Sequence, residues 1–257
     1  IMCVNDDAYA KEAVWYIRHL KLPDGYHIEW QCVKGAMSMA AGYNEAMKKS
    51  NARYKVYLHQ DVMILETAFI ENLLHIFRDP KVGMVGMVGA RKLSRNGELH
   101  ETFCVGKVYM AAAGATWCNA MGEDQGEECS VEMIDGLLMA TQYDLPWRED
   151  LSCGWESYDV LQSQEFIRNG YRVIVPAMDH PWCRHDCGYA TLHNYWFQRK
   201  KLVQGDGQKN QQLLHTGSLS KYRIWLLGTE KDCSTVEKLL DHKRVQVLGR
   251  VVLLEDM

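Results

Sequence analysis

The sequence lacks the features that mark several special classes of protein. Its longest stretch without a charged residue, at 108–121, contains Thr116, Cys118 and Asn119, so it is too short and too mixed to span a bilayer. Basic residues are not in excess: 29 Lys and Arg stand against 33 Asp and Glu, a formal net charge of −4. Binding to nucleic acid without sequence preference needs clustered positive charge, so we expect no such partner. The first seven residues contain neither a basic segment nor a cleavage signal, and we expect a cytoplasmic protein.

What is present is an ordinary globular composition. The 257 residues are 47% hydrophobic, 24% charged and 10% aromatic, which excludes a disordered, collagen-like or low-complexity chain. The length suits one large α/β domain, or one domain with a small attachment. The nine cysteines are odd in number and irregularly spaced, so free thiols are expected and not a disulfide framework.

Strand-like and helix-like segments alternate through the first part of the chain. The expected strands are 1–4, 27–33, 54–58, 82–89 and 171–175, and the expected helices lie before Pro23, after Ser38, before Pro80, at 155–168 and at 189–203. Strands separated by helices predict a mostly parallel, Rossmann-like sheet with both faces covered. Residues 91–130 break the rhythm and are expected to form hairpins and loops.

The last part of the chain predicts a separate small unit. Residues 204–220 are polar and suggest a linker. They are followed by an expected strand at 222–228, a helix at 234–240 and a strand at 245–254, which together form one βαβ-like unit. We therefore expect a main domain at 1–203, a linker at 204–220 and a C-terminal unit at 221–257, which is too small to fold well alone.

Two polar runs directly follow expected strands. Asn5-Asp6-Asp7 comes after the first strand and His59-Gln60-Asp61 after the third. Ligands of open parallel sheets bind beyond the carboxyl ends of the strands, so both runs are candidate binding residues. The alternative is local: Asp61 caps a turn.

Two further clusters lie in the second half. In the first, Asp159 sits at the start of the expected helix at 155–168, where the helix dipole favours an ionised carboxylate able to accept a proton; helix capping is the alternative. The second contains His180, Cys183, His185 and Cys187. Its spacing is not that of a common structural zinc site, which leaves either a closed zinc module or one histidine that joins a shared, open metal site.

These clusters, in this order, resemble the family-2-like glycosyltransferases with the GT-A fold, and in particular the bacterial glycosyltransferase-like group typified by a streptomycin-biosynthesis protein. The resemblance covers roughly residues 1–200 and rests on an ordered set of segments: 38–47, 54–62, 134–144, 146–150, 154–159 and 170–176. It implies a GT-A-type α/β fold. It also implies transfer of a sugar from a nucleotide-sugar donor, expected to be a UDP-sugar, to a hydroxyl of a glycan or other acceptor.

The resemblance also implies a divalent cation, Mn²⁺ or Mg²⁺. The family's D-x-D motif, which holds that cation against the nucleotide diphosphate, corresponds to His59-Gln60-Asp61, so Asp61 matches a motif carboxylate. His59 replaces the first Asp and is the expected substitute ligand. Some relatives add a later histidine, for which His185 is the first choice and His180 the second.

The remaining roles are carried over in the same way. Asp159 corresponds to the general base of inverting enzymes, with Tyr158 in place of the usual Glu. The resemblance assigns donor binding to Asn5, Asp6, Asn44, Gln60 and Asp61, and substrate binding to Asp135, Gly136 and Trp155. Two other functions stay open: a catalytically inactive GT-A module that binds a nucleotide or glycan, and a metal-binding structural module centred on 183–187.

Overall fold

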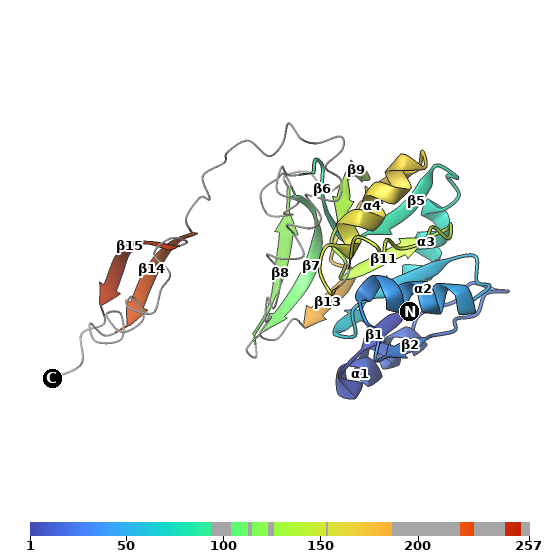
Figure 1. Ribbon diagram of the computed structural model, residues 1–257, viewed down its shortest axis with the longest axis horizontal. Helices are drawn as coiled ribbons and strands as arrows, with labels where there is room; N and C mark the ends of the chain where they lie inside the picture. The colour runs from blue at the N-terminus through green and yellow to red at the C-terminus, as the bar shows by residue number, and fades with distance from the viewer. Residues whose placement is uncertain are drawn as a thin grey trace. The chain divides into compact units, whose positions relative to one another are not determined.

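The computed structural model describes residues 1–93, 104–112, 115–122, 126–152 and 154–186, together with the strands at 222–228 and 245–252. The chain divides into two compact units, Ile1–Lys209 and Asn210–Met257 (Figure 1). The expected helices at 189–203 and 234–240 lie outside the described residues. The domain boundaries expected at 203 and 221 stay a prediction.

The central sheet of the first unit follows the chain's alternation of strands and helices. Strand β1 (Met2–Val4) pairs in parallel with β2 (Cys32–Lys34). Five further strands are hydrogen-bonded in this order: β3 (Lys55–Leu58), β11 (Leu138–Thr141), β5 (Val82–Gly86), β12 (Arg172–Val175) and β9 (Cys129–Val131).

Backbone hydrogen bonds at Ile1 join these two groups of strands. Its amino group donates to the carbonyl of Val56 at 2.8 Å, and its carbonyl accepts from the N–H of Leu58 at 3.1 Å. In parallel strands, a residue forms hydrogen bonds with the two residues that flank its partner on the neighbouring strand. Strands β1, β2, β3, β5 and β12 therefore share one direction, as the sequence predicts, while β11 and β9 run antiparallel to their neighbours.

A second sheet packs beside the first and was not predicted in this form. Its order is β10 (Met133–Ile134), β6 (Val88–Ala90), β7 (Cys104–Ala112), β13 (Cys183–Asp186) and β4 (Val62–Ile64), with β8 (Ala115–Met121) forming a hairpin with β7. The hairpin lies within the region where hairpins were expected. The single strand expected at 82–89 is wrong, because β5 and β6 belong to different sheets. The chain passes from one sheet to the other at Met87. Gly106 packs against this residue so closely that a Cβ on Gly106 would lie 2.1 Å from the carbonyl oxygen of Met87.

Four helices lie within the described part of the chain: α1 (Asp7–Arg18), α2 (Met39–Lys49), α3 (Phe69–Ile76) and α4 (Tyr158–Arg168). Side chains cap the first two, since Asp6 accepts from the N–H of Ala8 at 2.8 Å and Ser38 accepts from that of Ala41 at 3.1 Å. Helix α4 begins three residues later than expected, because Ser157 has a φ of 62° that no helical residue adopts. In place of the strand expected at 27–33, the structure has the shorter strand β2, which begins at Cys32.

The core lies between these sheets and helices and is held by close aromatic contacts. Tyr43, Tyr57 and Trp147 are almost fully buried, and their ring centroids lie 4.9–5.0 Å apart. Each such pair contributes about 0.5–1.5 kcal/mol beyond its buried area. The trio fixes α2 and the segment before α4 against β3, which is the strand that leads to the predicted metal motif.

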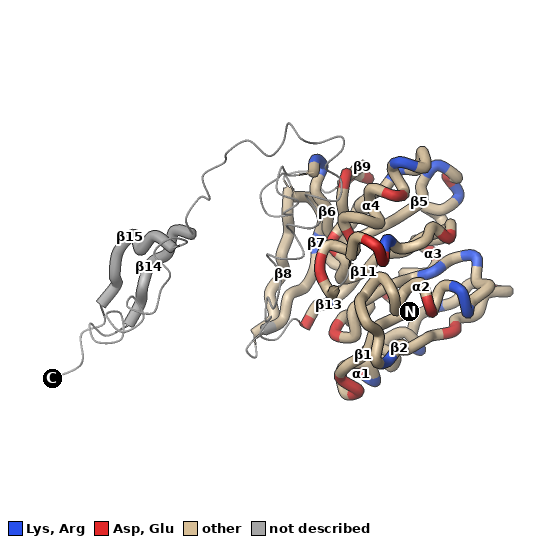
Figure 2. The backbone as a smooth tube through the Cα atoms, viewed as in Figure 1, with Lys and Arg blue, Asp and Glu red and all other residues tan. Residues whose placement is uncertain are grey.

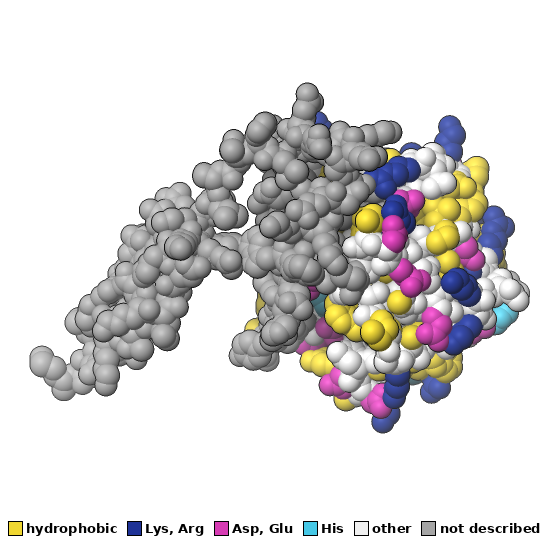
Figure 3. Space-filling model, in the orientation of Figure 1, with side chains coloured by type: hydrophobic (Ala, Val, Ile, Leu, Met, Phe, Trp, Pro, Cys, Tyr) yellow, Lys and Arg dark blue, Asp and Glu magenta, His cyan; other side chains and the backbone are white. Residues whose placement is uncertain are grey.

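Charge lies mainly outside this framework. Figure 2 shows Lys, Arg, Asp and Glu mostly on loops and helix ends, with few on the strands. On the face drawn in Figure 3 the two signs of charge are interspersed among scattered hydrophobic side chains. Both views agree with the small net charge.

The second unit contains β14 (Tyr222–Gly228) and β15 (Val245–Val252), which pair in parallel. Both strands were predicted, the second to within two residues. A parallel pair needs a crossover connection, as the expected βαβ-like unit supplies. Among the described residues, no helix combines the length and the apolar character needed to cross a membrane.

Candidate functional site

The two predicted polar runs lie side by side at the carboxyl ends of β1 and β3. The side-chain oxygen of Gln60 accepts from the backbone N–H of Asn5 and of Asp6, each at 2.9 Å, and its amide nitrogen contacts the side-chain oxygen of Asn5. Asp6 meanwhile caps α1. The sheet thus brings together three of the predicted donor-binding residues, all at an exposed or half-buried edge.

His59, Asp61 and His185 form a cluster that is suited to a metal ion. The Oδ1 atom of Asp61 lies 4.0 Å from Nδ1 of His59 and 3.6 Å from Nε2 of His185, and each of the three residues offers one ligand atom within 4.8 Å of the other two. Strand β13 carries His185 here, because it pairs with β4 and sets His185 opposite Val62. The backbone N–H of Asp186 also donates to the carbonyl of Asp61 at 2.9 Å.

The ionised form of the Asp61 carboxyl group is favoured in this cluster. Oδ1 of Asp61 is buried and has no hydrogen-bond partner among the residues that the structure describes. Burial alone would raise the pKa of Asp61, but His185 and His59 outweigh it and lower that pKa. Burial lowers the pKa of His59, and the neighbouring His185 lowers it further. A carboxylate with an unused buried lone pair and imidazole nitrogens is a donor set that Mn²⁺ accepts.

Asp159 lies in the first turn of α4 and is half-buried. Its two carboxylate oxygens accept from the backbone N–H of Gly136 at 2.9 Å and of Val160 at 2.8 Å. Burial, followed by the negative charge of Asp135, raises the pKa of Asp159 to about 7, although the two N–H donors oppose the shift. A carboxyl group with a pKa near neutrality is suited to exchange protons at physiological pH.

The turn at Asp135 and Gly136 connects the metal cluster with Asp159. The side chain of Asp135 accepts from the N–H of Leu137 at 2.9 Å, which fixes the turn. The carbonyl of Leu137 accepts from the N–H of His59 at 3.0 Å. The turn therefore contacts the metal motif on one side and Asp159 on the other, so these predicted residues share one region of the molecule.

The side chain of Tyr158 links the metal motif at 59–61 directly with the start of α4. Its hydroxyl group is hydrogen-bonded to Nε2 of His59, and its side chain is buried. Gly136 is required beneath it, since a Cβ at that position would lie 2.1 Å from the hydroxyl oxygen. Sequence reasoning noted Tyr158 only as a replacement and missed this contact.

Tyr9 was also missed. The carboxylate of Asp186, then burial, then the carboxylate of Asp61 raise the pKa of Tyr9. No pattern in the sequence signals this position, because Tyr9 falls within a helix that was identified only by its apolar face.

Trp155 precedes α4 by three residues and has 49% of its surface exposed, which leaves its ring free to stack. The segment that carries it is anchored, because the carbonyl of Gly154 accepts from the N–H of Met39 at 3.0 Å. Ser157, in the left-handed region, turns the chain from this segment into α4. Strained backbone is often found at functional sites. The role of Trp155 stays a prediction.

Asn44 is placed differently from the other predicted donor-binding residues. It is buried, its amide nitrogen donates to the carbonyl of Trp147 at 2.9 Å and to Glu149 at 2.6 Å, and its oxygen accepts from the N–H of Trp147 at 2.8 Å. These contacts hold α2 to the segment before α4. Its role in nucleotide binding stays a prediction.

The cluster at 180–187 does not gather around one point. His180 bonds to Glu66 at 2.8 Å, and Cys183 is fully buried, which raises the pKa of its thiol. His185 joins Asp61 instead, and Cys187 lies outside the described residues. Within the part of the chain that the structure describes, the metal-competent group contains neither Cys183 nor His180. The single shared histidine is the alternative that this geometry favours.

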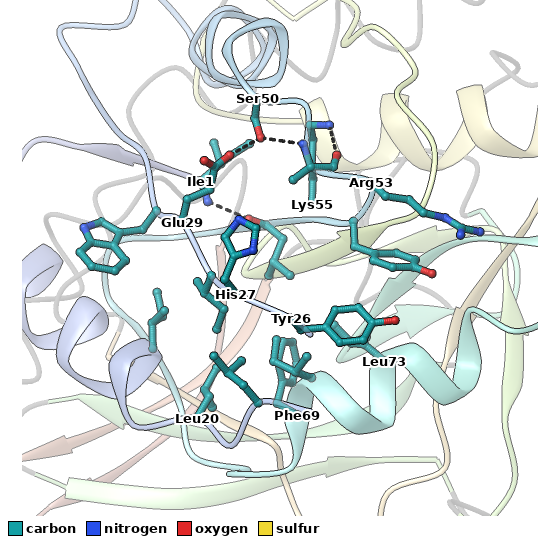
Figure 4. Close-up of a pocket in the computed structure, with 18 of the residues that line it drawn as sticks. Ile1, Leu20, Tyr26, His27, Glu29, Ser50, Arg53, Lys55, Phe69 and Leu73 are labelled. Atoms are coloured by element: carbon teal, nitrogen blue, oxygen red, sulfur yellow. Dashed lines mark hydrogen bonds between the residues drawn. The ribbon is translucent and has the colours of Figure 1, made fainter. Parts of the chain in front are cut away.

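A cavity of about 670 Å³ lies elsewhere, at the amino ends of the strands (Figure 4). It is lined by residues before β2, by the starts of β1 and β3, and by α3. Ser50 donates to Glu29 at 2.5 Å at its rim, and Phe69 and Leu73 line its apolar side. Its lining includes none of the residues predicted for the site, so the cavity is separate from the metal cluster.

Comparison with known proteins adds a family and a fold. The model of the glycosyltransferase-like family matches residues 1–205. No curated protein matches. Among solved structures, the chain is similar to the mannosyltransferase PcManGT from Pyrobaculum calidifontis in complex with GDP-Man and Mn²⁺, with 15% identity and a TM-score of 0.52 over 82% of this chain and 63% of that one. It is also similar to S. aureus TarS 1–349, with 10% identity and a TM-score of 0.49 over 79% of this chain and 62% of that one.

Both similarities cover only part of the other protein and involve few identical residues. The chain spans less than two thirds of the length of either of these two solved structures. At such low identity a structural match establishes the fold alone. The predicted GT-A-type fold is confirmed by the family match together with the mannosyltransferase structure, and the likeness to the streptomycin-biosynthesis group stays a prediction.

Proposed function

The chain belongs to the glycosyltransferase-like family, and from this premise we propose that it transfers a sugar from a nucleotide-sugar donor to a hydroxyl acceptor. The observation that carries the proposal is a juxtaposition. A cluster able to hold a cation and a half-buried carboxyl group with a pKa of about 7 lie beside the same turn at Asp135 and Gly136.

His59, Asp61 and His185 would hold a divalent cation. When bound, such a cation neutralises the negative charge that develops on a departing nucleoside diphosphate. Oδ1 of Asp61, which accepts no hydrogen bond within the described part of the chain, supports this assignment, as does the mixed nitrogen and oxygen donor set. The mannosyltransferase from P. calidifontis was solved with Mn²⁺, which makes Mn²⁺ the first metal to test.

Asp159 would act as the general base of an inverting transfer. As a carboxylate it would take the proton of the acceptor hydroxyl while that oxygen attacks the anomeric carbon of the donor. The hydrogen bonds from Gly136 and Val160 would hold the carboxylate in one orientation before the acceptor arrives. Trp155 would stack on a sugar ring, and its exposure is compatible with that role.

The donor would lie over the carboxyl ends of β1 and β3. Asn5, Asp6 and Gln60 already form a hydrogen-bonded group there, next to Asp61. A UDP-sugar is the expected donor from the family resemblance. GDP-Man is the second candidate, because the mannosyltransferase that shares this fold was solved with it. A glycan or another hydroxyl compound would be the acceptor.

The second candidate function is a GT-A module that binds a nucleotide or glycan without catalysis. One observation favours it: His59 and Tyr158 occupy the places where the resemblance expects an Asp and a Glu, and they bond to each other. A binding module would keep nucleotide affinity and metal dependence but would turn over no donor.

Thermal unfolding with UDP, GDP, CDP and dTDP, each with and without Mn²⁺, tests donor binding. A ligand present at 100 times its Kd stabilises the folded state by about 2.7 kcal/mol. We expect one nucleotide to stabilise the chain and Mn²⁺ to increase that effect. Absence of any shift with all four nucleotides would contradict the transferase and a nucleotide-binding module, and would leave only a module that binds a glycan. Hydrolysis or transfer of the matching nucleotide-sugar then separates the enzyme from the binding module.

A further inference from the structure

The two departures from the family pattern are partners in space. His59 follows β3 and Tyr158 opens α4, 99 residues later, yet Nε2 of His59 is hydrogen-bonded to the hydroxyl of Tyr158. Their ring centroids lie 6.3 Å apart. A change at either residue alone would leave the other polar group without its partner, so the two replacements have to be understood together.

The hydroxyl of Tyr158 has little freedom to move. The side chain is 4% exposed and packs against Tyr43, with ring centroids 5.9 Å apart. Gly136 has no Cβ, and the hydroxyl of Tyr158 fills the space that a Cβ would occupy. The residue is therefore held by Tyr43 and by the turn at Gly136, with its oxygen bonded to the imidazole of His59.

The orientation of His59 decides which of its nitrogens faces the metal cluster. Nδ1 lies 4.0 Å from Oδ1 of Asp61, while Nε2 is engaged by Tyr158. A nitrogen that binds a cation must be unprotonated, and the other ring nitrogen then carries the hydrogen and needs an acceptor. Within this ring, Nδ1 is the nitrogen available to a cation, and Nε2 is the one that needs the acceptor.

We propose that Tyr158 is a positioning residue of the metal site: its hydroxyl oxygen accepts the Nε2–H of His59 and thereby presents Nδ1 of His59 to the cation bound with Asp61 and His185. The inference rests on the proposed function, because it assumes that this cluster binds a divalent cation.

A phenol is suited to this task at this position. Asp135 and Asp159 already place two carboxylates beside the turn under Tyr158, and the charge of Asp135 disfavours ionisation of Asp159. A glutamate at 158 would accept the same hydrogen bond but would add a third negative charge to a buried region, which is costly. A tyrosine supplies the acceptor and remains neutral.

Binding of Mn²⁺ to the full chain, followed by the electron paramagnetic resonance signal of the free ion, tests the proposal. Partners that orient a metal ligand typically change metal affinity by about 10–100-fold, so we expect Tyr158→Phe to weaken binding by that factor. Tyr57→Phe is the matched control, because Tyr57 is equally buried in the same aromatic group but its hydroxyl does not contact His59. We expect the control to bind Mn²⁺ like the unmodified chain.

A double-mutant cycle separates positioning from a general structural role. His59→Asp restores the carboxylate of the family motif and removes the imidazole, so Tyr158→Phe should then leave Mn²⁺ affinity unchanged. An equal loss in both backgrounds would mean that Tyr158 only supports the packing of α4 and would overturn the proposal.

A spectroscopic measurement on the unmodified chain keeps the test valid if a variant fails to fold. With diamagnetic Zn²⁺ as the probe ion, ¹⁵N resonances of His59 should show a proton on Nε2 and none on Nδ1. A proton on Nδ1 with the ion bound would overturn the proposal. Absence of Mn²⁺ and Zn²⁺ binding by the unmodified chain would remove the metal from the proposed function, whereas equal binding by Tyr158→Phe would overturn only this inference.

Discussion

The backbone N–H of Gly136 donates a 2.9 Å hydrogen bond to Oδ2 of Asp159, which joins two segments 23 residues apart. Val160 donates to the other carboxylate oxygen, so both oxygens of Asp159 are held. The turn that provides this donor also carries Asp135, whose charge acts in the opposite direction on the protonation of Asp159. One turn thus orients the carboxyl group and keeps its proton affinity high.

Asp159→Asn should abolish transfer while nucleotide binding persists. An amide has nearly the same shape but cannot take a proton, and general-base catalysis contributes about 10²–10⁴-fold to a rate. We expect a fall of that size in the rate of transfer or donor hydrolysis, measured with the nucleotide-sugar that stabilises the chain. Nucleotide affinity in a thermal-shift titration should be unchanged.

Asp150→Asn is the matched control for this variant. Asp150 is an exposed carboxylate of the preceding segment and pairs with Arg148 at 2.6 Å, outside the hydrogen bonds that hold Asp159. It should keep full activity. If both variants were equally active, Asp159 would not be the base.

Transfer should depend on pH with a midpoint of about 7. Burial and Asp135 raise the pKa of Asp159 to about 7, and only its deprotonated form accepts a proton, so the rate should rise as pH increases through this value. The rate at saturating donor, measured from pH 5.5 to 8.5, gives the midpoint. Asp135→Asn removes the second cause of the shift and should move the midpoint to lower pH; a midpoint that did not move would exclude Asp135 as a cause.

The raised pKa of Asp159 also makes the stability of the fold depend on pH. Stability should fall as pH rises, whereas the rate of transfer should rise. The folded state binds the proton of Asp159 more tightly than the unfolded state does, since the pKa is raised from 3.8. The contribution to stability is fully present below about pH 4 and is lost as pH rises towards 7. In urea unfolding across this range, Asp159→Asn should flatten the decline, and an unchanged decline would contradict the assignment.

Gly136→Ala should destabilise the chain and disturb the site. The added Cβ would lie 2.1 Å from the hydroxyl oxygen of Tyr158 and 2.6 Å from its ring carbon, and overpacking of this kind costs about 1–3 kcal/mol. Urea unfolding measures the loss. Combining the substitution with Tyr158→Phe, which removes the nearest atom, should recover part of it.

Gly25→Ala separates this clash from an effect of alanine on the backbone. Gly25 has open space around it and a φ of 83°, so alanine there costs only the left-handed conformation, about 1–2 kcal/mol. Tyr158→Phe should recover none of that cost. Equal recovery in both backgrounds would mean that Gly136 and Tyr158 do not conflict directly.

Asn44→Ala distinguishes a structural role from a nucleotide-binding one. Loss of the Asn44 side-chain amide leaves the buried N–H and carbonyl of Trp147 without these partners, which costs about 1–3 kcal/mol of stability for each unsatisfied group. Asn51→Ala, two residues beyond the end of α2 and exposed, should cost little. If Asn44 also contacts the nucleotide, the affinity of the folded variant should fall as well; unchanged affinity would reject that predicted role.

The sequence by itself determined the local elements and the chemistry of the motifs. Helix α3 was predicted because its apolar residues recur at helical spacing before Pro80, and β3 because a short apolar run ends in His59-Gln60-Asp61. The GT-A-type fold was implied by the resemblance of an ordered set of segments to a known family, and the family match over residues 1–205 confirms it. These features depend on neighbours along the chain, which a sequence displays.

Only the tertiary structure decided which of these groups meet. Nothing between 59 and 158 indicates that His59 and Tyr158 are hydrogen-bonded, or that β13 pairs with β4 and delivers His185 to Asp61 and not to Cys183. The division of 82–90 into strands of two sheets is equally invisible, because both pieces are apolar. Contacts between distant segments arise from the pairing of strands and the packing of whole elements, and a local pattern contains no record of either.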